Sequence, residues 1–149
     1  MVNQFIYTRH LSDGPDSDLD WELLIRVWLF GDKYLMPSLQ NKVMNVLILK
    51  NNKKNVTPTS FLELIYSNTP PGSPLRMFVV DLAAYKFNMA LIMTPVEGRR
   101  WPHEALFDLV KVMGAKKMED FGKFALPEEN KDRCYYHIHA DGKNCDTKL

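Results

Sequence analysis

The chain has 149 residues, with 19 lysines and arginines against 18 aspartates and glutamates. A net charge of +1 creates no field over the whole protein that would attract nucleic acid or an anionic membrane, so any such binding has to be local. No apolar run reaches the roughly 18 residues of a membrane span, and the N-terminus lacks the basic-then-apolar order of a signal peptide. We expect an intracellular protein of the cytoplasm or nucleus, not secreted and without a membrane partner, whose two cysteines are reduced thiols or metal ligands.

The first twenty residues contain little apolar sequence. Residues 5–7 are apolar and polar residues follow at once, which predicts the end of a helix and not an independent element. The loop 11–20 carries Gly14, Pro15 and four aspartates, a composition that favours turns. Ser17 or Asp18 is expected to cap the helix that follows, with Asp20 in its first turn.

Residues 21–49 are the most apolar part of the chain and predict two helices broken at Met36-Pro37. Proline disfavours the α conformation at the preceding residue and fits the first helical turn, so one helix should end near Leu35 and the next should start at Pro37. The first helix has only a narrow polar line, and such a helix is expected to lie inside a structure. Its polar line is Glu22, Arg26 and Lys33, and its apolar residues are Trp21, Leu23, Leu24, Ile25, Val27, Trp28, Phe30 and Tyr34.

Two further helices are predicted after a polar connector at residues 50–55. One has Pro58 at its first position and ends at Asn68, and the other starts at Pro74 after a Ser73 cap. Arg76 and Asp81 are expected to lie off the apolar side of the second helix. That side consists of Leu75, Phe78, Val79, Leu82, Tyr85, Lys86 and Met89.

Residues 94–102 are predicted to be a loop. The Arg99-Arg100-Trp101 cluster in it could anchor an interface, or Trp101 could pack while the arginines stay in solvent, and we favour the second interpretation. A helix is expected from Trp101-Pro102 to Gly114, and a short one at 116–124. Because no stretch between 21 and 124 alternates with a period of two, we predict an all-α fold. This would be a compact bundle or array of five to six helices, in one domain at 1–126 followed by a tail at 127–149.

The tail concentrates residues that bind metals. DRCYYHIHADGKNC places Cys134, His137, His139 and Cys145 in a C-x2-H-x-H-x5-C arrangement. Two thiolates and two imidazoles suit tetrahedral zinc, which predicts one structural zinc ion. The alternative is a loosely ordered tail with solvated histidines, since the spacing belongs to none of the common zinc-finger classes.

A plain hairpin in the tail would be incompatible with this site. It would turn at Asp141-Gly142 and put the cysteines and histidines on opposite faces. The metal prediction therefore requires a turn, and not an extended strand, around Cys134 to His137.

Two stretches of the chain resemble a known family. The run LIRVWLFGDKYLMPSLQNKVMNVL, residues 24–47, resembles the late helices of a BTB/POZ domain, although Gly31 stands where the family prefers alanine and Val43 where many members have cysteine. YSNTPPGSPLRMFVVDLAAY, residues 66–85, resembles the segment that follows the BTB domain in a group of fungal proteins. The segment FIYTRHL resembles the end of the helix that precedes this pair, and the Cys/His tail is similar to the tail of the same fungal group.

The resemblance implies the C-terminal helical part of a fungal BTB/POZ protein without the N-terminal, sheet-containing half. Residues 1–55 would hold the late BTB helices and 56–126 the following helical region. The implied function is protein-protein interaction, by self-association or by recruiting a partner such as a cullin-type ubiquitin ligase. Without the missing half, aromatic residues of the first helix would stay exposed unless later helices or a second copy cover them, which predicts oligomerisation or marginal stability. These residues are Trp21, Trp28, Phe30 and Tyr34.

Catalysis is not expected, because the sequence contains no GxSxG, no glycine-rich phosphate loop, no HExxH and no calcium-binding loop. Cys134 could be paired with His103 or His137, but no third group to orient the pair is recognisable. The alternative function is a small metal-dependent nucleic-acid-binding protein that uses the Cys/His tail and the lysines near residue 50. We do not expect nucleic acid as a partner, since those lysines are not interleaved with aromatic residues.

Overall fold

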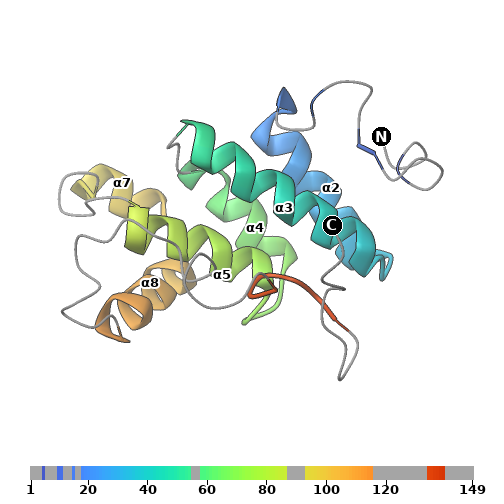
Figure 1. Cartoon of the computed structure of the whole chain (residues 1–149). Coiled ribbons are helices and arrows are strands. Elements are labelled where there is room, and N and C mark those ends of the chain that lie inside the picture. The colour runs from blue at the N-terminus through green and yellow to red at the C-terminus, as the bar shows by residue number, and fades with distance from the viewer. Residues whose placement is uncertain are drawn as a thin grey trace. The chain divides into compact units, whose positions relative to one another are not determined.

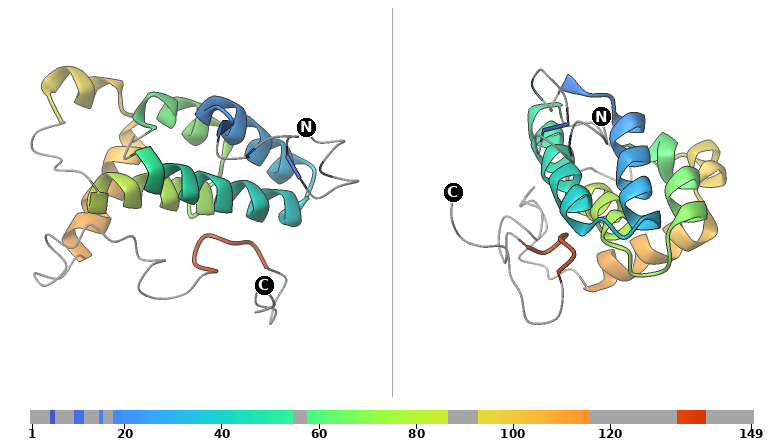
Figure 2. Two further views of the ribbon diagram at one scale, coloured as in Figure 1. Left: turned by 45° about the horizontal axis from the view of Figure 1, so that its top comes forward. Right: turned by 90° about the vertical axis from the view of Figure 1, so that its right-hand side faces the viewer.

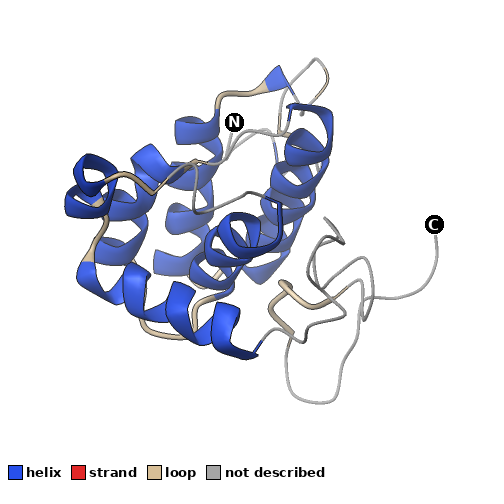
Figure 3. Ribbon diagram, turned by 90° about the vertical axis from the view of Figure 1, so that its left-hand side faces the viewer, coloured by secondary structure: helices blue, strands red, loops and turns tan. Residues whose placement is uncertain are grey.

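The computed structural model describes residues 5, 10–11, 15, 18–54, 58–86, 93–115 and 134–139. Within these ranges the regular elements are helices and no strand is found, so the all-α prediction is confirmed (Figures 1 and 3). The chain divides into two units, Met1–Val56 with His137–Leu149, and Thr57–Tyr136. The predicted helix at 116–124 lies outside the described residues, and the predicted division into a domain at 1–126 and a tail stays a prediction.

The first unit is built on a helical hairpin of α2 (Trp21–Lys33) and α3 (Pro37–Lys54), which lie side by side (Figures 1 and 2). Asp20 is the N-cap of α2, and its carboxylate accepts a hydrogen bond of 3.0 Å from the Glu22 amide. The prediction of Ser17 or Asp18 as the cap was wrong. A side-chain acceptor next to the first free amides satisfies them, and Asp20 is the residue that reaches them.

The turn between the two helices confirms the predicted break at Met36-Pro37. The Met36 amide donates to the Gly31 carbonyl at 2.8 Å and the Leu35 amide to the Asp32 carbonyl at 3.2 Å. These two bonds form a Schellman motif, whose C′ residue takes the left-handed conformation. Here that residue is Leu35, with a φ of +52° and a side chain that is 87% exposed.

Close contact between the helices explains the glycine at position 31. A Cβ atom there would lie 2.8 Å from the Gln40 Cγ, nearer than real carbon atoms approach. The side-chain Nε2 of Gln40 on α3 donates to the Asp32 carboxylate on α2 at 3.1 Å. The resulting core consists of Leu24, Ile25, Trp28, Leu39, Val43, Met44 and Leu47.

Two predictions about this hairpin need correction. The first helix does not lie wholly inside, because Leu23, Phe30 and Tyr34 are exposed on one flank, although Trp21 and Trp28 are buried. The segment 50–55 is not simply a connector, because α3 continues to Lys54. Lys50 is buried and its ammonium lies 6.0 Å from the centroid of the Trp21 ring, so that its aliphatic stem packs while its charge lies over the aromatic face.

The second unit starts with a 3₁₀ turn, η2 (Thr59–Phe61), which leads into α4 (Leu62–Asn68). It continues with α5 (Pro74–Asp81) and η3 (Leu82–Lys86), a π-helical extension of α5. The predicted end at Asn68 and start at Pro74 are confirmed. Helices α4, α5 and α8 (His103–Ala115) contact one another around a core of Leu62, Ile65, Leu75, Phe78, Val79, Leu82, Ala105 and Leu109.

The loop predicted at 94–102 contains a helix, α7 (Pro95–Arg100). Thr94 caps it, since the hydroxyl accepts a hydrogen bond of 3.2 Å from the Glu97 amide, and Pro95 takes the first helical position. Trp101 is buried while Arg99 and Arg100 are exposed, which confirms the favoured interpretation of this cluster.

Arg76 and Asp81 are both buried, so the prediction that they lie off the packing side of their helix was wrong. The Arg76 guanidinium stacks 4.2 Å from the centroid of the Tyr66 ring. It donates to the carbonyls of Tyr66 and Thr69, to the Thr69 hydroxyl and to the Glu104 carboxylate. One side chain of α5 therefore satisfies the carboxyl end of α4 and reaches α8, which offsets the cost of burying the charge.

Tyr66 connects the same helices through its hydroxyl, which donates to the Asp108 carboxylate of α8 at 3.0 Å. Burial, followed by the hydrogen bond to Asp108 and the negative charge of that group, raises the pKa of Tyr66 above its ordinary value. The phenol therefore stays protonated and remains a donor at neutral pH.

The left-handed turn predicts a stabilising substitution. Leu35→Gly should raise the free energy of unfolding by about 0.5 to 1 kcal/mol, because glycine adopts a positive φ without the steric cost that leucine carries. Urea denaturation would measure this as a higher midpoint concentration, with no change in the dependence of the free energy of unfolding on urea. The matched control is Leu49→Gly, at an exposed position of α3. It should lower the free energy of unfolding by about 1 kcal/mol, because glycine is a poor helix former. A Leu35→Gly protein no more stable than the parent would contradict the assignment of strain to this turn.

The buried Arg76 predicts a large loss of stability when its charge is removed. Arg76→Met keeps most of the packing volume but leaves the Tyr66 and Thr69 carbonyls without their charged donor, so it should destabilise the protein by about 2 to 4 kcal/mol. The control is Arg26→Met, which removes an exposed ion pair with Glu22 and should change stability by less than about 1 kcal/mol. Equal effects of the two substitutions in thermal or urea unfolding would show that Arg76 does not connect these helices.

Candidate metal centre

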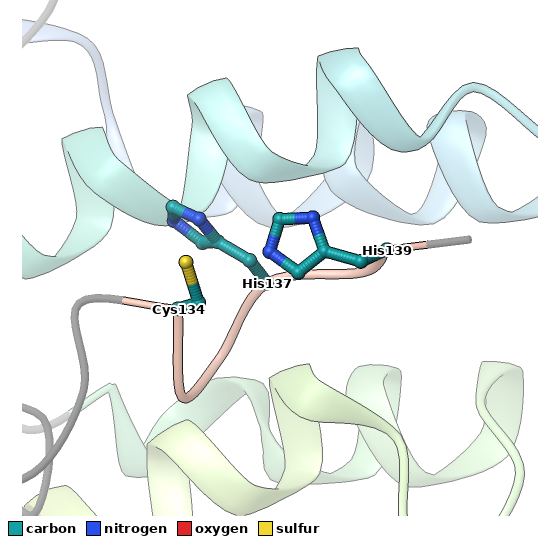
Figure 4. A group of neighbouring side chains, drawn as sticks. All are labelled: Cys134, His137 and His139. Carbon is teal, nitrogen blue, oxygen red and sulfur yellow. The ribbon is translucent and has the colours of Figure 1, made fainter. Parts of the chain in front are cut away.

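Three of the four predicted metal ligands are brought together in the tail. Cys134, His137 and His139 each offer one ligand atom, and these atoms lie within 4.8 Å of one another. Figure 4 shows the three side chains on one side of the backbone, with the thiol pointing toward the His137 ring. The fourth predicted ligand, Cys145, lies outside the described residues.

The backbone has the shape that the metal prediction requires. Residues 134–136 form a turn, which brings the cysteine back toward the histidines. Residues 137–139 follow without regular structure, and the two imidazoles lie with their centroids 5.9 Å apart. The rival hairpin would turn at Asp141-Gly142, which lies outside the described residues.

The three side chains suit a borderline-soft metal ion. With zinc-sulfur bonds of about 2.3 Å and zinc-nitrogen bonds of about 2.0 to 2.1 Å, ligand atoms of a tetrahedral site lie about 3.3 to 3.6 Å apart. The spread of up to 4.8 Å is wider than this, so a bound ion would draw the three atoms together by about 1 Å. All three side chains are partly exposed, which leaves them accessible to an ion from solvent.

Two asparagines of α3 hold the histidine-bearing part of the tail within the first unit. Asn41 Oδ1 accepts from the Ile138 amide at 2.8 Å, and Asn41 Nδ2 donates to the Ile138 carbonyl at 2.9 Å. One helical turn later, Asn45 Oδ1 lies 2.8 Å from Nε2 of His137. Residues four apart share a helix face, so one side of α3 binds both the backbone and an imidazole of the tail.

Tyr136 anchors its own part of the tail within the second unit. Its ring is buried and meets Phe78 edge-on with centroids 5.4 Å apart, while its hydroxyl donates to the Asp81 carboxylate at 2.7 Å. Burial and the negative charge of Asp81 raise the pKa of the neighbouring Tyr135. The Tyr136 hydroxyl thus gives the buried Asp81 a hydrogen-bond donor, which a polar group inside a helical core needs to offset the cost of its burial.

Four residues that bond to the tail or fix it were not predicted from the sequence: Asn41, Asn45, Asp81 and Tyr136. A signal for the asparagines was available: two of them stand one turn apart inside a long helix, where asparagine is a poor helix former and favours other hydrogen bonds. The signal for Asp81 was an acidic residue between apolar neighbours of a packed helix. Neither pattern identifies the partner in the tail.

A hollow of about 160 Å³ lies in the second unit beside α5 and α8. Three of its polar residues serve the fold: Arg76 satisfies the end of α4, Asp108 accepts from Tyr66 and Asp81 accepts from Tyr136. Lys111 and Tyr135 also line it. Met77, Val80 and Val112 supply an apolar lining.

The chain matches no protein-family model, no curated protein and no solved structure. The resemblance to BTB/POZ proteins stays a prediction. In the described part of the chain, none of the helices has both the length and the hydropathy needed to cross a membrane.

Proposed function

We propose that this chain is a non-enzymatic protein-protein interaction module of the BTB/POZ type. One observation of the structure supports this most directly, an apolar stripe on α2 that faces solvent. The stripe consists of Leu23 and Phe30 on the helix, Tyr34 at its C-cap and Leu35 in the turn after it. Phe30, Tyr34 and Leu35 lie within the stretch that resembles the late BTB helices, and Leu23 directly precedes it. The function that this resemblance implies is interaction with a second copy or with an adaptor partner.

The stripe has the chemistry of an interaction surface. Leu23, Phe30 and Tyr34 are 41%, 38% and 55% exposed, although apolar neighbours on the same helix are fully buried. The Phe30 and Tyr34 rings are in contact, with centroids 4.4 Å apart and planes tilted by 38°, and the Lys33 ammonium lies 5.7 Å from the centroid of the Tyr34 ring. Paired aromatic residues bordered by charge are typical of the residues that contribute most to binding.

The tail would add a structural zinc site to this module. We propose that Cys134, His137, His139 and Cys145 bind one zinc ion. The proximity of the first three side chains supports the site, and Cys145 supplies the fourth ligand that a closed structural site needs. With four protein ligands, no position is left for a reactive water, which is consistent with a non-enzymatic function.

The exposed stripe predicts self-association. The purified chain should show a molecular mass that rises with concentration in light scattering or sedimentation, and the double variant Phe30→Ser with Tyr34→Ser should stay monomeric because it loses the paired rings. The control Val96→Ser changes a single exposed apolar residue of α7 and should associate like the parent. A parent protein that is monomeric over the whole concentration range would overturn self-association through this stripe.

The same purified protein can be used to distinguish the rival function, metal-dependent nucleic-acid binding, from protein-protein interaction. Generic DNA and RNA are titrated at several salt concentrations, because contacts to phosphate make the affinity fall steeply with salt. Saturable binding with this salt dependence would favour the rival and contradict the proposal.

The zinc proposal predicts the metal content of protein purified without added zinc or a histidine tag. Elemental analysis should find about one zinc per chain, with strong losses in Cys134→Ser and Cys145→Ser, since each removes one ligand. Acid or a chelator should release the ion because the thiols and imidazoles bind it in their deprotonated forms. Less than about a tenth of an equivalent in the parent, or unchanged content in both variants, would exclude the site.

A further inference from the structure

The contact between α3 and the tail determines the tautomer of one candidate ligand, that is, which ring nitrogen of the neutral imidazole carries the proton. Nε2 of His137 lies 2.8 Å from Oδ1 of Asn45. A carbonyl oxygen can only accept a hydrogen bond, so the ring nitrogen that faces it has to carry the proton. In the neutral imidazole the lone pair is then on Nδ1, and this nitrogen is the one able to bind a metal ion.

The neighbouring asparagine fixes the backbone between the two histidines. Asn41 bonds to both the amide and the carbonyl of Ile138, at 2.8 and 2.9 Å. Since His137 and His139 flank this residue, their Cα atoms are held in place by α3 before any ion binds. An imidazole with a fixed Cα atom and Nε2 bonded to Asn45 has little rotational freedom left, so the direction of Nδ1 is set by the same contacts.

We propose that Asn45 is a positioning residue for the metal site: it orients His137 so that the ring binds the ion through Nδ1, while Nε2 donates to the Asn45 side chain. This inference rests on the proposed zinc site and adds the ligand atom and a residue of α3 to it. Histidines that bind metals in proteins use their second nitrogen in this way, most often toward a carboxylate or carbonyl oxygen.

The zinc affinity of three variants tests the proposal, measured by competition with a chromophoric chelator. Asn45→Ala should weaken zinc binding by about 10- to 100-fold, the usual effect of removing such a partner. Asn45→Asp should bind at least as tightly as the parent, because a carboxylate accepts the same proton and makes the ring a better ligand. Asn52→Ala, at an exposed position of the same helix, is the matched control and should leave the affinity unchanged.

Nuclear magnetic resonance of the parent protein gives a second readout that a purely structural role of Asn45 would not produce. In long-range proton-nitrogen correlation spectra of the zinc-loaded protein, His137 should show a metal-bound Nδ1 and a protonated Nε2. Asn45→Ala should lose this single tautomer, and Asn45→Asp should restore it. Circular dichroism establishes that each variant keeps its helices.

The outcomes separate the two proposals. Zinc binding by the parent together with unchanged affinity in Asn45→Ala, or ligation of His137 through Nε2, would overturn the role of Asn45 and leave the zinc site standing. A parent protein that binds no zinc would overturn both.

Discussion

The turn between α2 and α3 determines which faces of the two helices remain available for binding. The left-handed Leu35, the proline that follows at position 37 and the close approach of Gly31 to Gln40 fix the rotation of each helix in the pair. With one side of each helix buried between them, Phe30 and Tyr34 are left in solvent on α2, and Asn41 and Asn45 are presented to the tail by α3. Both surfaces that carry the proposed functions therefore follow from the same packing.

Local sequence signals predicted the break at Met36-Pro37, the helix end at Asn68 and the helix start at Pro74, but a helix start at Pro58 was wrong, because a 3₁₀ turn precedes α4 there. Proline restricts its own φ and the residue before it, so Pro37 and Pro74 mark helix starts without any knowledge of the fold. The same reasoning failed at α7, although its capping signal was present: Thr94 stands three residues before Glu97, as in a capping box. The prolines and the glycine of this stretch favoured a loop, and the hydrogen bond from the Glu97 amide to Thr94 outweighed that composition.

The polar interactions that join distant parts of each unit were beyond the reach of such signals. Periodicity assigns Arg76 to the polar side of α5, because an isolated helix would leave a guanidinium in water. Its burial depends on the carbonyls at the end of α4 and on Glu104, none of which the pattern of α5 contains. Likewise, the spacing of the tail residues predicted that Cys134 and the histidines could share an ion, but not that α3 would bond to His137 and Ile138.

Those contacts to α3 bear directly on how a short tail can form a metal site. Ordering a residue costs about 1 to 2 kcal/mol of backbone entropy, and a segment with few large apolar side chains recovers little of it by burial. Asn41 reduces the entropy that Ile138 still has to lose when the tail is ordered, since the amide and the carbonyl of Ile138 are already bonded to α3. Less of the free energy of metal binding is then consumed in ordering the chain. A site whose ligands start within 4.8 Å of one another needs only a small contraction to close around an ion.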